Sequence, residues 1–157
     1  MKRILGNLLF IIFCSTVLFL SLRGLPGNPT QEDLNTSVWK EHGPLELSPE
    51  RGRFALTYSI IENSSFFFSL PIARFAMPDV GYHNGQYVSL FAPGVSFIIM
   101  PGYILGKSLG FSQVGAVTIV GFFAIANALL IVSIAKKLGI HPLAATIGGL
   151  TFLFASP

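Results

Sequence analysis

The sequence predicts an all-α polytopic membrane protein that carries a large folded loop outside the membrane. Two observations carry this prediction. The 157 residues are 52% hydrophobic and 11% charged, whereas a soluble domain has roughly 25% charged residues. All seven acidic residues and four of the ten basic residues lie within residues 24–87, so this stretch has a net charge of −3 and the rest of the chain +6. Basic residues that flank apolar runs are typical of a membrane protein, and this distribution argues against a nucleic-acid partner.

The first transmembrane helix is predicted over residues 1–23. Its uncharged part, residues 4–22, is long enough to cross a hydrocarbon core of about 30 Å. A signal peptide is the alternative, but the run exceeds a usual apolar signal region of about 7–15 residues and no small-residue cleavage site follows it. Lys2 and Arg3 then place the N-terminus in the cytoplasm and residues 24–87 outside.

The outer loop, residues 24–87, begins with an irregular stretch rich in Gly, Pro, Asn and Thr. Ser48-Pro49-Glu50 then predicts a helix over about 49–62, with Ser48 as its N-cap, Pro49 at its first position and Glu50 in its first turn. Phe54, Tyr58 and Ile61 follow at helical spacing. We therefore expect an amphipathic helix against the membrane surface or the helical bundle.

A β-hairpin is predicted near the end of this loop. Asn84-Gly85 separates two short runs that carry Tyr82 and Tyr87, and an Asn-Gly pair in this position is a strong hairpin signal. The loop is therefore expected to be folded.

Residues 88–107 are apolar, but Pro93-Gly94 and Pro101-Gly102 interrupt them. They either cross the membrane or lie at its interface as a Pro-broken segment. The interfacial interpretation is favoured because it places Lys136 and Lys137 on the cytoplasmic side with the N-terminus. Two further transmembrane helices are predicted, over 112–135 and 143–157, and the second is interpreted as truncated because the chain ends within it.

A scan for the motifs of soluble enzymes finds no GxGxxG, GxxxxGK[ST], HExxH or GxSxG. The single cysteine, Cys14, excludes a disulfide within the chain and a Cys-based metal site. Half of a secondary transporter fits less well, because transporters place ionisable groups at mid-membrane and the predicted spans 4–22, 112–135 and 143–156 carry none.

Several local strings resemble one class of membrane enzyme. They are Pro78-Asp79, Tyr82-x-Asn84-Gly85-x-Tyr87-x-Ser89, Ala92-Pro93-Gly94 and the run SPERGRFALTYS at 48–59. Together with the order of helix, large outer loop and Pro-rich apolar stretch, they are similar to the GT-C class of membrane glycosyltransferases. The similarity is to the first-loop region of bacterial and archaeal relatives of the dolichyl-phosphate-mannose protein mannosyltransferases, and it covers most of the chain.

The resemblance implies transfer of a sugar from a polyprenyl-phosphate carrier to an acceptor on the outer or luminal face. The family places an acid in this loop, often an Asp followed by a Glu; here Pro49 stands at the Asp position and Glu50 at the second. Glu50 is therefore the first catalytic candidate and Asp79 the second. A carboxylate can act as a general base or hold a divalent metal at the phosphate, and the sequence leaves the metal open. For Glu50 the alternative is a purely electrostatic role at a helix N-terminus, and for Asp79 a turn cap.

The resemblance also implies binding residues. Arg51, Arg53 and Arg74 suit a lipid phosphate, the alternative being ion pairs with Glu46, Glu50 or Glu62. Tyr82 and Tyr87 can stack on a sugar, the alternative being a cross-strand aromatic pair or an interface anchor.

The expected partners are membrane lipids, a polyprenyl-phosphate-linked sugar, and missing C-terminal helices or a partner chain, since the family is several times longer. The expected location is the cell membrane, as a multi-pass protein. The rival hypothesis is a non-catalytic membrane assembly or interaction subunit that retains the outer loop.

Overall fold

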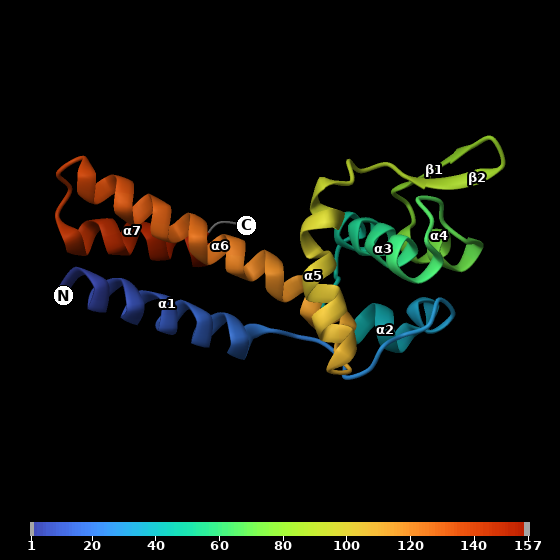
Figure 1. Cartoon of the computed structure of the whole chain (residues 1–157), viewed down its shortest axis with the longest axis horizontal. Coiled ribbons are helices and arrows are strands. Elements are labelled where there is room, and N and C mark those ends of the chain that lie inside the picture. The colour runs from blue at the N-terminus through green and yellow to red at the C-terminus, as the bar shows by residue number, and fades with distance from the viewer. Residues whose placement is uncertain (1, 156–157) are drawn as a thin grey trace. The chain divides into compact units, whose positions relative to one another are not determined.

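The structure is a computed structural model that describes residues 2–155, with side chains from Gly6 onward (Figure 1). It is mostly helical. Its elements, in chain order, are α1 (Lys2–Ser21), a 3-10 turn (Asp33–Asn35), α2 (Ser37–His42), α3 (Ser48–Asn63), α4 (Leu70–Ala76), β1 (Val80–His83), β2 (Gln86–Ser89), α5 (Gly94–Ser108), α6 (Ser112–Lys137) and α7 (Pro142–Ala155).

Two compact units share the chain. We call residues 22–119 the mixed unit, and residues 1–21 together with 120–157 the apolar unit. Helix α6 contributes its first turns to the mixed unit and its remainder to the apolar unit. Met1, Ser156 and Pro157 lie outside the described residues, as do the side chains of Lys2 and Arg3, on which the predicted orientation depends.

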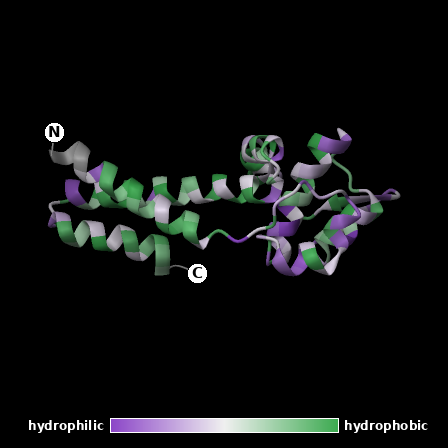
Figure 2. Ribbon diagram, turned by 90° about the horizontal axis from the view of Figure 1, so that it is seen from below, coloured by the Kyte–Doolittle hydropathy of each residue, from purple (hydrophilic) through white to green (hydrophobic). Residues whose placement is uncertain are grey.

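The apolar unit consists of α1, the later part of α6, and α7. Its small core is formed by Phe10, Cys14, Ile125, Ala128, Val132 and Ala145. Gly149 allows α7 to approach α6 closely, because a methyl group there would collide with Val132. Large apolar side chains also cover the outside of these helices, among them Leu9, Phe19 and Phe122, and Figure 2 shows their hydrophobic colour along the helices.

One helix of the described chain, Ser112–Lys137, is long and apolar enough to cross a membrane. The other apolar helices, Gly6–Ser21 and Pro142–Ala155, are shorter. The helical class is therefore confirmed, while the multi-pass arrangement stays a prediction.

The mixed unit is built around α3, which packs against α4 and α5. Phe54 is the centre of an aromatic cluster, with ring centroids 5.6 Å from Tyr103 and 6.3 Å from Phe75. Leu34, from the 3-10 turn, and Ile72, from α4, are also fully buried in this core.

Helix α3 confirms the predicted element but differs from the prediction in two respects. It begins one residue earlier, with Leu47 rather than Ser48 as its N-cap residue. The expected single apolar stripe is wrong, because the six consecutive residues 54–59 are all buried. The polar members of this run are satisfied locally: Thr57 Oγ1 donates to the Ser96 carbonyl at 2.9 Å and Ser59 Oγ to the Phe67 carbonyl at 2.6 Å.

Helix α5 was expected to be broken at its second proline, but it continues through Pro101. The loss of one backbone donor is tolerated there because the helix is held by close packing against α6. A methyl group at Gly102 would collide with the Gly115 carbonyl, and one at Gly106 would lie 2.6 Å from the Phe111 carbonyl. The two backbones are therefore nearly in contact.

The predicted hairpin is confirmed. β1 and β2 pair antiparallel, with Tyr82 opposite Tyr87, and the turn residues Asn84 and Gly85 have φ values of 50° and 81°. Two consecutive positive φ angles are typical of the type I′ turn that an Asn-Gly pair favours.

The mixed unit is closed where the chain enters and leaves it. The Gly27 amide donates a 2.6 Å hydrogen bond to the Gly110 carbonyl. Gly24 lies against Val114, with no room for a side chain between them.

Candidate functional site

A polar network fixes α5 on α3. Ser96 Oγ donates to the Arg53 carbonyl at 2.9 Å, beside the Thr57 bond to Ser96. Further along, Tyr103 Oη donates to Glu62 Oε1 at 2.8 Å, and Lys107 Nζ contacts both carboxylate oxygens at 2.7 Å. These contacts fix α5 on α3, the helix that carries Glu50, Arg51 and Arg53.

The tyrosines in this interface are shielded from water. Burial raises the pKa of Tyr103, and the hydrogen bond to the negative Glu62 raises it further. Burial is also the main reason that the pKa of Tyr58 lies above its ordinary value, with Glu62 and Asp33 adding to it. Both phenols are therefore held in the neutral, hydrogen-bonding form.

Glu50, the first catalytic candidate, is occupied by the start of its own helix. Its Oε2 accepts a hydrogen bond of 3.1 Å from the Leu47 amide. A carboxylate at this position both satisfies a free amide and complements the helix dipole. The Glu50 carboxylate therefore lies where the alternative role, at the N-terminus of α3, requires it.

Asp79, the second candidate, lies immediately before β1. Its backbone is fixed, since its amide donates to the Ala76 carbonyl at 3.2 Å. Its carboxylate oxygen Oδ2 is buried, and no group in the described residues hydrogen-bonds to it. Arg51 Nε and both side-chain amide atoms of Gln113 are buried and unpaired among the described residues in the same way. No described hydrogen bond or ion pair joins Asp79 to Glu50.

The three predicted arginines make no ion pair with any described side chain. The acids expected to pair with them are engaged elsewhere, because Glu46 binds Arg23 at 2.9 Å and Glu62 binds Lys107. The Arg53 guanidinium lies over the Phe91 ring, 5.0 Å from its centroid. Arg51 Nε is buried without a partner among the described residues, and Arg74 is exposed in the last turn of α4.

Tyr82 and Tyr87 form the cross-strand pair that was the alternative to sugar stacking, with ring centroids 4.9 Å apart. Tyr82 is nevertheless 67% exposed. The backbone carbonyl of Tyr87 accepts a 2.8 Å hydrogen bond from the Phe68 amide. This bond holds the hairpin against the segment that precedes α4.

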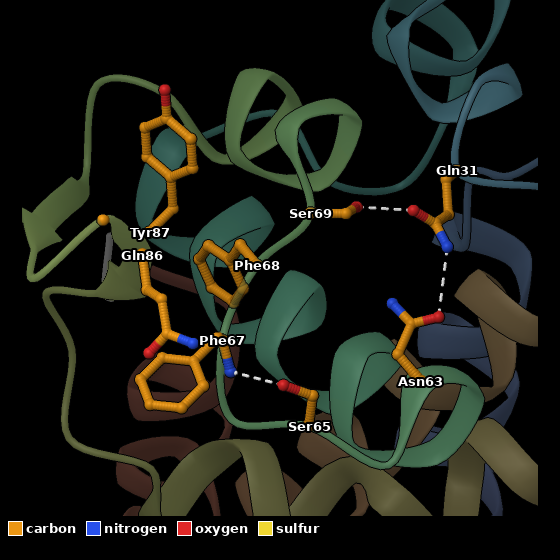
Figure 3. Close-up of a pocket in the computed structure, with 9 residues that line it drawn as sticks. Gln31, Asn63, Ser65, Phe67, Phe68, Ser69, Gln86 and Tyr87 are labelled. Atoms are coloured by element: carbon orange, nitrogen blue, oxygen red, sulfur yellow. Dashed lines mark hydrogen bonds between the residues drawn. The ribbon is translucent and has the colours of Figure 1, made fainter.

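A cavity of about 350 Å³ lies in the mixed unit (Figure 3). Five of the residues that line it carry amides or hydroxyls, three carry aromatic rings and one is a glycine: Gln31, Asn63, Ser65, Ser69, Gln86, Phe67, Phe68, Tyr87 and Gly85. Tyr87 is the one predicted site residue among them. The sequence did not point to the others as one site, because Gln31 and Asn63, which are hydrogen-bonded, lie 32 positions apart in the chain.

A second cavity, of about 820 Å³, lies in the apolar unit. It is lined by Gly6, Lys136, Lys137, Gly139, Ile140, His141 and Pro142, and it contains no predicted site residue. Among the described residues, no three His, Cys, Asp or Glu side chains gather as a metal cluster would require.

Comparison with protein-family models, with curated proteins and with solved structures finds no match for this chain.

Proposed function

We propose that the chain is the N-terminal part of a membrane glycosyltransferase that transfers a sugar from a polyprenyl-phosphate carrier to an acceptor on the outer face of the membrane. The strings at 78–94 support the proposal by their resemblance to the first loop of that class. The folding of these strings into a hairpin and the start of α5 supports it as well, because a transfer site needs residues held in fixed positions.

The observation that carries the proposal is the unpaired Oδ2 of Asp79. In the proposed reaction this carboxylate takes the proton from an acceptor hydroxyl. The hydroxyl oxygen forms a bond to the anomeric carbon, the bond from that carbon to the phosphate oxygen breaks, and the carrier phosphate leaves with the electron pair. Asp79 thereby replaces Glu50 as the leading candidate, since the Glu50 carboxylate already caps α3.

The carrier phosphate needs cationic partners, and Arg51 and Arg53 are the proposed ones. Neither has an ion pair with a described side chain, and Phe91 orients the guanidinium face of Arg53 while its N–H edge stays available. If a divalent ion neutralises the phosphate instead, Asp79 would hold that ion rather than act as the general base.

The test compares Asp79→Asn with Glu50→Gln in membranes from cells that express the natural gene, so that any further helices or partner chain are present. The measurement is release of the carrier phosphate from dolichyl-phosphate-mannose and from its undecaprenyl counterpart. Asp79→Asn should lower turnover by at least about 100-fold, the usual contribution of a general base. Glu50→Gln should keep turnover within about threefold, the change expected of a cap.

The opposite pattern would return Glu50 to the first place and refute the role given to Asp79. Consumption of neither carrier by the unaltered protein would favour the alternative, a non-catalytic assembly or interaction subunit.

A further inference from the structure

The cavity of about 350 Å³ in the mixed unit combines features that suit one class of ligand. Every residue that lines it is uncharged. A phosphate, a carboxylate or a cation would find no group of opposite charge among these residues. The cavity therefore favours a neutral ligand, and its amide and hydroxyl groups require that ligand to form hydrogen bonds.

One donor in the cavity is held in a fixed orientation. Ser69 Oγ donates to Gln31 Oε1, and Gln31 Nε2 donates to Asn63 Oδ1 at 3.1 Å. Because this chain occupies the oxygen of Asn63, its Nδ2 group is left as a donor, and Figure 3 shows that nitrogen turned into the cavity. A donor that is already fixed loses little conformational entropy when it binds a hydroxyl oxygen.

Further hydrogen-bonding groups surround this donor. Ser65 Oγ accepts the Phe67 amide at 3.0 Å, which leaves the hydroxyl proton of Ser65 free to donate. The side-chain amide of Gln86 forms no hydrogen bond with any described residue and lies beside Phe67 (Figure 3). Donors and acceptors thus stand on both sides of the cavity.

Aromatic rings supply the apolar part of the surface. Phe67 is 44% exposed, whereas its neighbour Phe68 is only 5% exposed. An exposed ring beside amides matches a ligand with an apolar face and a hydroxylated rim, which is the character of a sugar ring. The volume is at the lower end of the range of about 300–1,000 Å³ for ligand pockets, so it suits one or two such rings.

We propose that this cavity binds an uncharged saccharide, with Asn63 and Gln86 as its hydrogen-bonding residues. The binding of the saccharide does not rest on the proposed function, because Asp79 is not among the residues that line this cavity.

The experiment uses the full chain in nanodiscs of phosphatidylcholine, because maltoside detergents would compete with a sugar. Methyl α-mannopyranoside and methyl β-glucopyranoside are titrated by saturation-transfer NMR, with mannose 6-phosphate as the charged comparison. At least one neutral glycoside should bind, and the phosphate should add no affinity.

Asn63→Ala removes the free donor, so it should weaken neutral-glycoside binding by at least about three- to tenfold, the value of one hydrogen bond. Gln86→Ala should weaken it similarly. The matched control is His83→Ala, because His83 faces Gln86 across the hairpin and lies outside the cavity lining; it should change affinity less than about twofold. Circular dichroism confirms that each variant is folded.

The proposal is overturned if the folded chain binds neither glycoside, if it prefers the phosphorylated sugar, or if both pocket variants bind like the unaltered chain. Binding without any transfer activity would contradict the proposed function and leave the saccharide site standing. Asp79-dependent transfer without glycoside binding would do the reverse.

Discussion

Tyr103 on α5 donates a 2.8 Å hydrogen bond to the carboxylate of Glu62 on α3, which lies 41 positions earlier in the chain. The phenol is almost fully buried, and the Glu62 side chain is 23% exposed. This contact joins α3, which carries Glu50, Arg51 and Arg53, to α5, the helix that follows the hairpin. The geometry of the candidate site therefore depends on a bond outside it.

Removing this bond should destabilise the mixed unit. Tyr103→Phe keeps the aromatic packing and loses the donor to a charged acceptor, so we expect a loss of about 1–2 kcal/mol in the free energy of unfolding, measured by denaturant titration. Lys107 still neutralises Glu62, which limits the cost. The matched control is Tyr82→Phe, whose exposed hydroxyl should contribute less than about 0.5 kcal/mol. Equal losses in the two variants would contradict the role given to the Tyr103 bond.

Alkaline pH should weaken the same interface. The pKa of Tyr58 and of Tyr103 is higher in the folded chain than the ordinary value of 10.0. Their contribution to stability is therefore complete below about pH 10 and is lost as the pH rises above it, because the unfolded chain then releases phenol protons that the folded chain retains. Phenolate absorbance, followed together with circular dichroism, should show two of the four tyrosines ionising only as the fold is lost. Early ionisation of all four in a folded chain would refute the burial of this pair.

The contact between α5 and α6 should tolerate no added methyl group. Gly102→Ala places a carbon against the Gly115 carbonyl. We therefore expect the free energy of unfolding to fall by about 1–3 kcal/mol and the melting temperature to fall with it. Gly94→Ala, in the same helix, is the control because nothing lies within 4 Å of its added carbon. It should be neutral or stabilise by up to about 1 kcal/mol. A Gly102→Ala chain as stable as the control would show that the two helices are further apart.

Glu50 should contribute to stability even if it takes no part in chemistry. Glu50→Ala leaves the Leu47 amide without its acceptor and removes a negative charge from the start of α3. We therefore expect the free energy of unfolding to fall by about 0.5–2 kcal/mol, as measured by thermal unfolding. Glu46→Ala is the comparison, because its ion pair with Arg23 is exposed on both sides and should contribute at most about 1 kcal/mol. An unaltered melting temperature for Glu50→Ala would remove the capping role.

Local signals allowed the sequence to predict α3 and the hairpin. They did not predict α2 (Ser37–His42), which lies in the stretch expected to be irregular, or α4 (Leu70–Ala76). Asn84-Gly85 predicted the hairpin because its two positive φ angles are a property of those residue types. Pro49 located the start of α3 to within one residue. The burial of α3 could not be predicted in this way, because Thr57 and Ser59 look like a polar face until the carbonyls of Ser96 and Phe67 are brought to them.

The residue types of the candidate site could be predicted from the sequence, but their hydrogen bonding and burial could not. Glu50 and Asp79 were both named from the sequence, yet which carboxylate is occupied depends on a backbone amide and on burial. The saccharide cavity depends on Gln31 meeting Asn63 and Ser69. Contacts between an irregular segment and two helix ends leave no periodic trace in a sequence.

The hydrogen bond between Gly27 and Gly110 has a consequence for how this protein can change. Because Gly27 and Gly110 are in contact, the 82 residues between them begin and end at one point of the mixed unit. A replacement for this stretch would have to keep small residues where Gly102 and Gly106 pack against Gly115. The stretch can therefore be exchanged as a single cassette, by recombination in evolution or by grafting in the laboratory, and the specificity carried on it would travel with it.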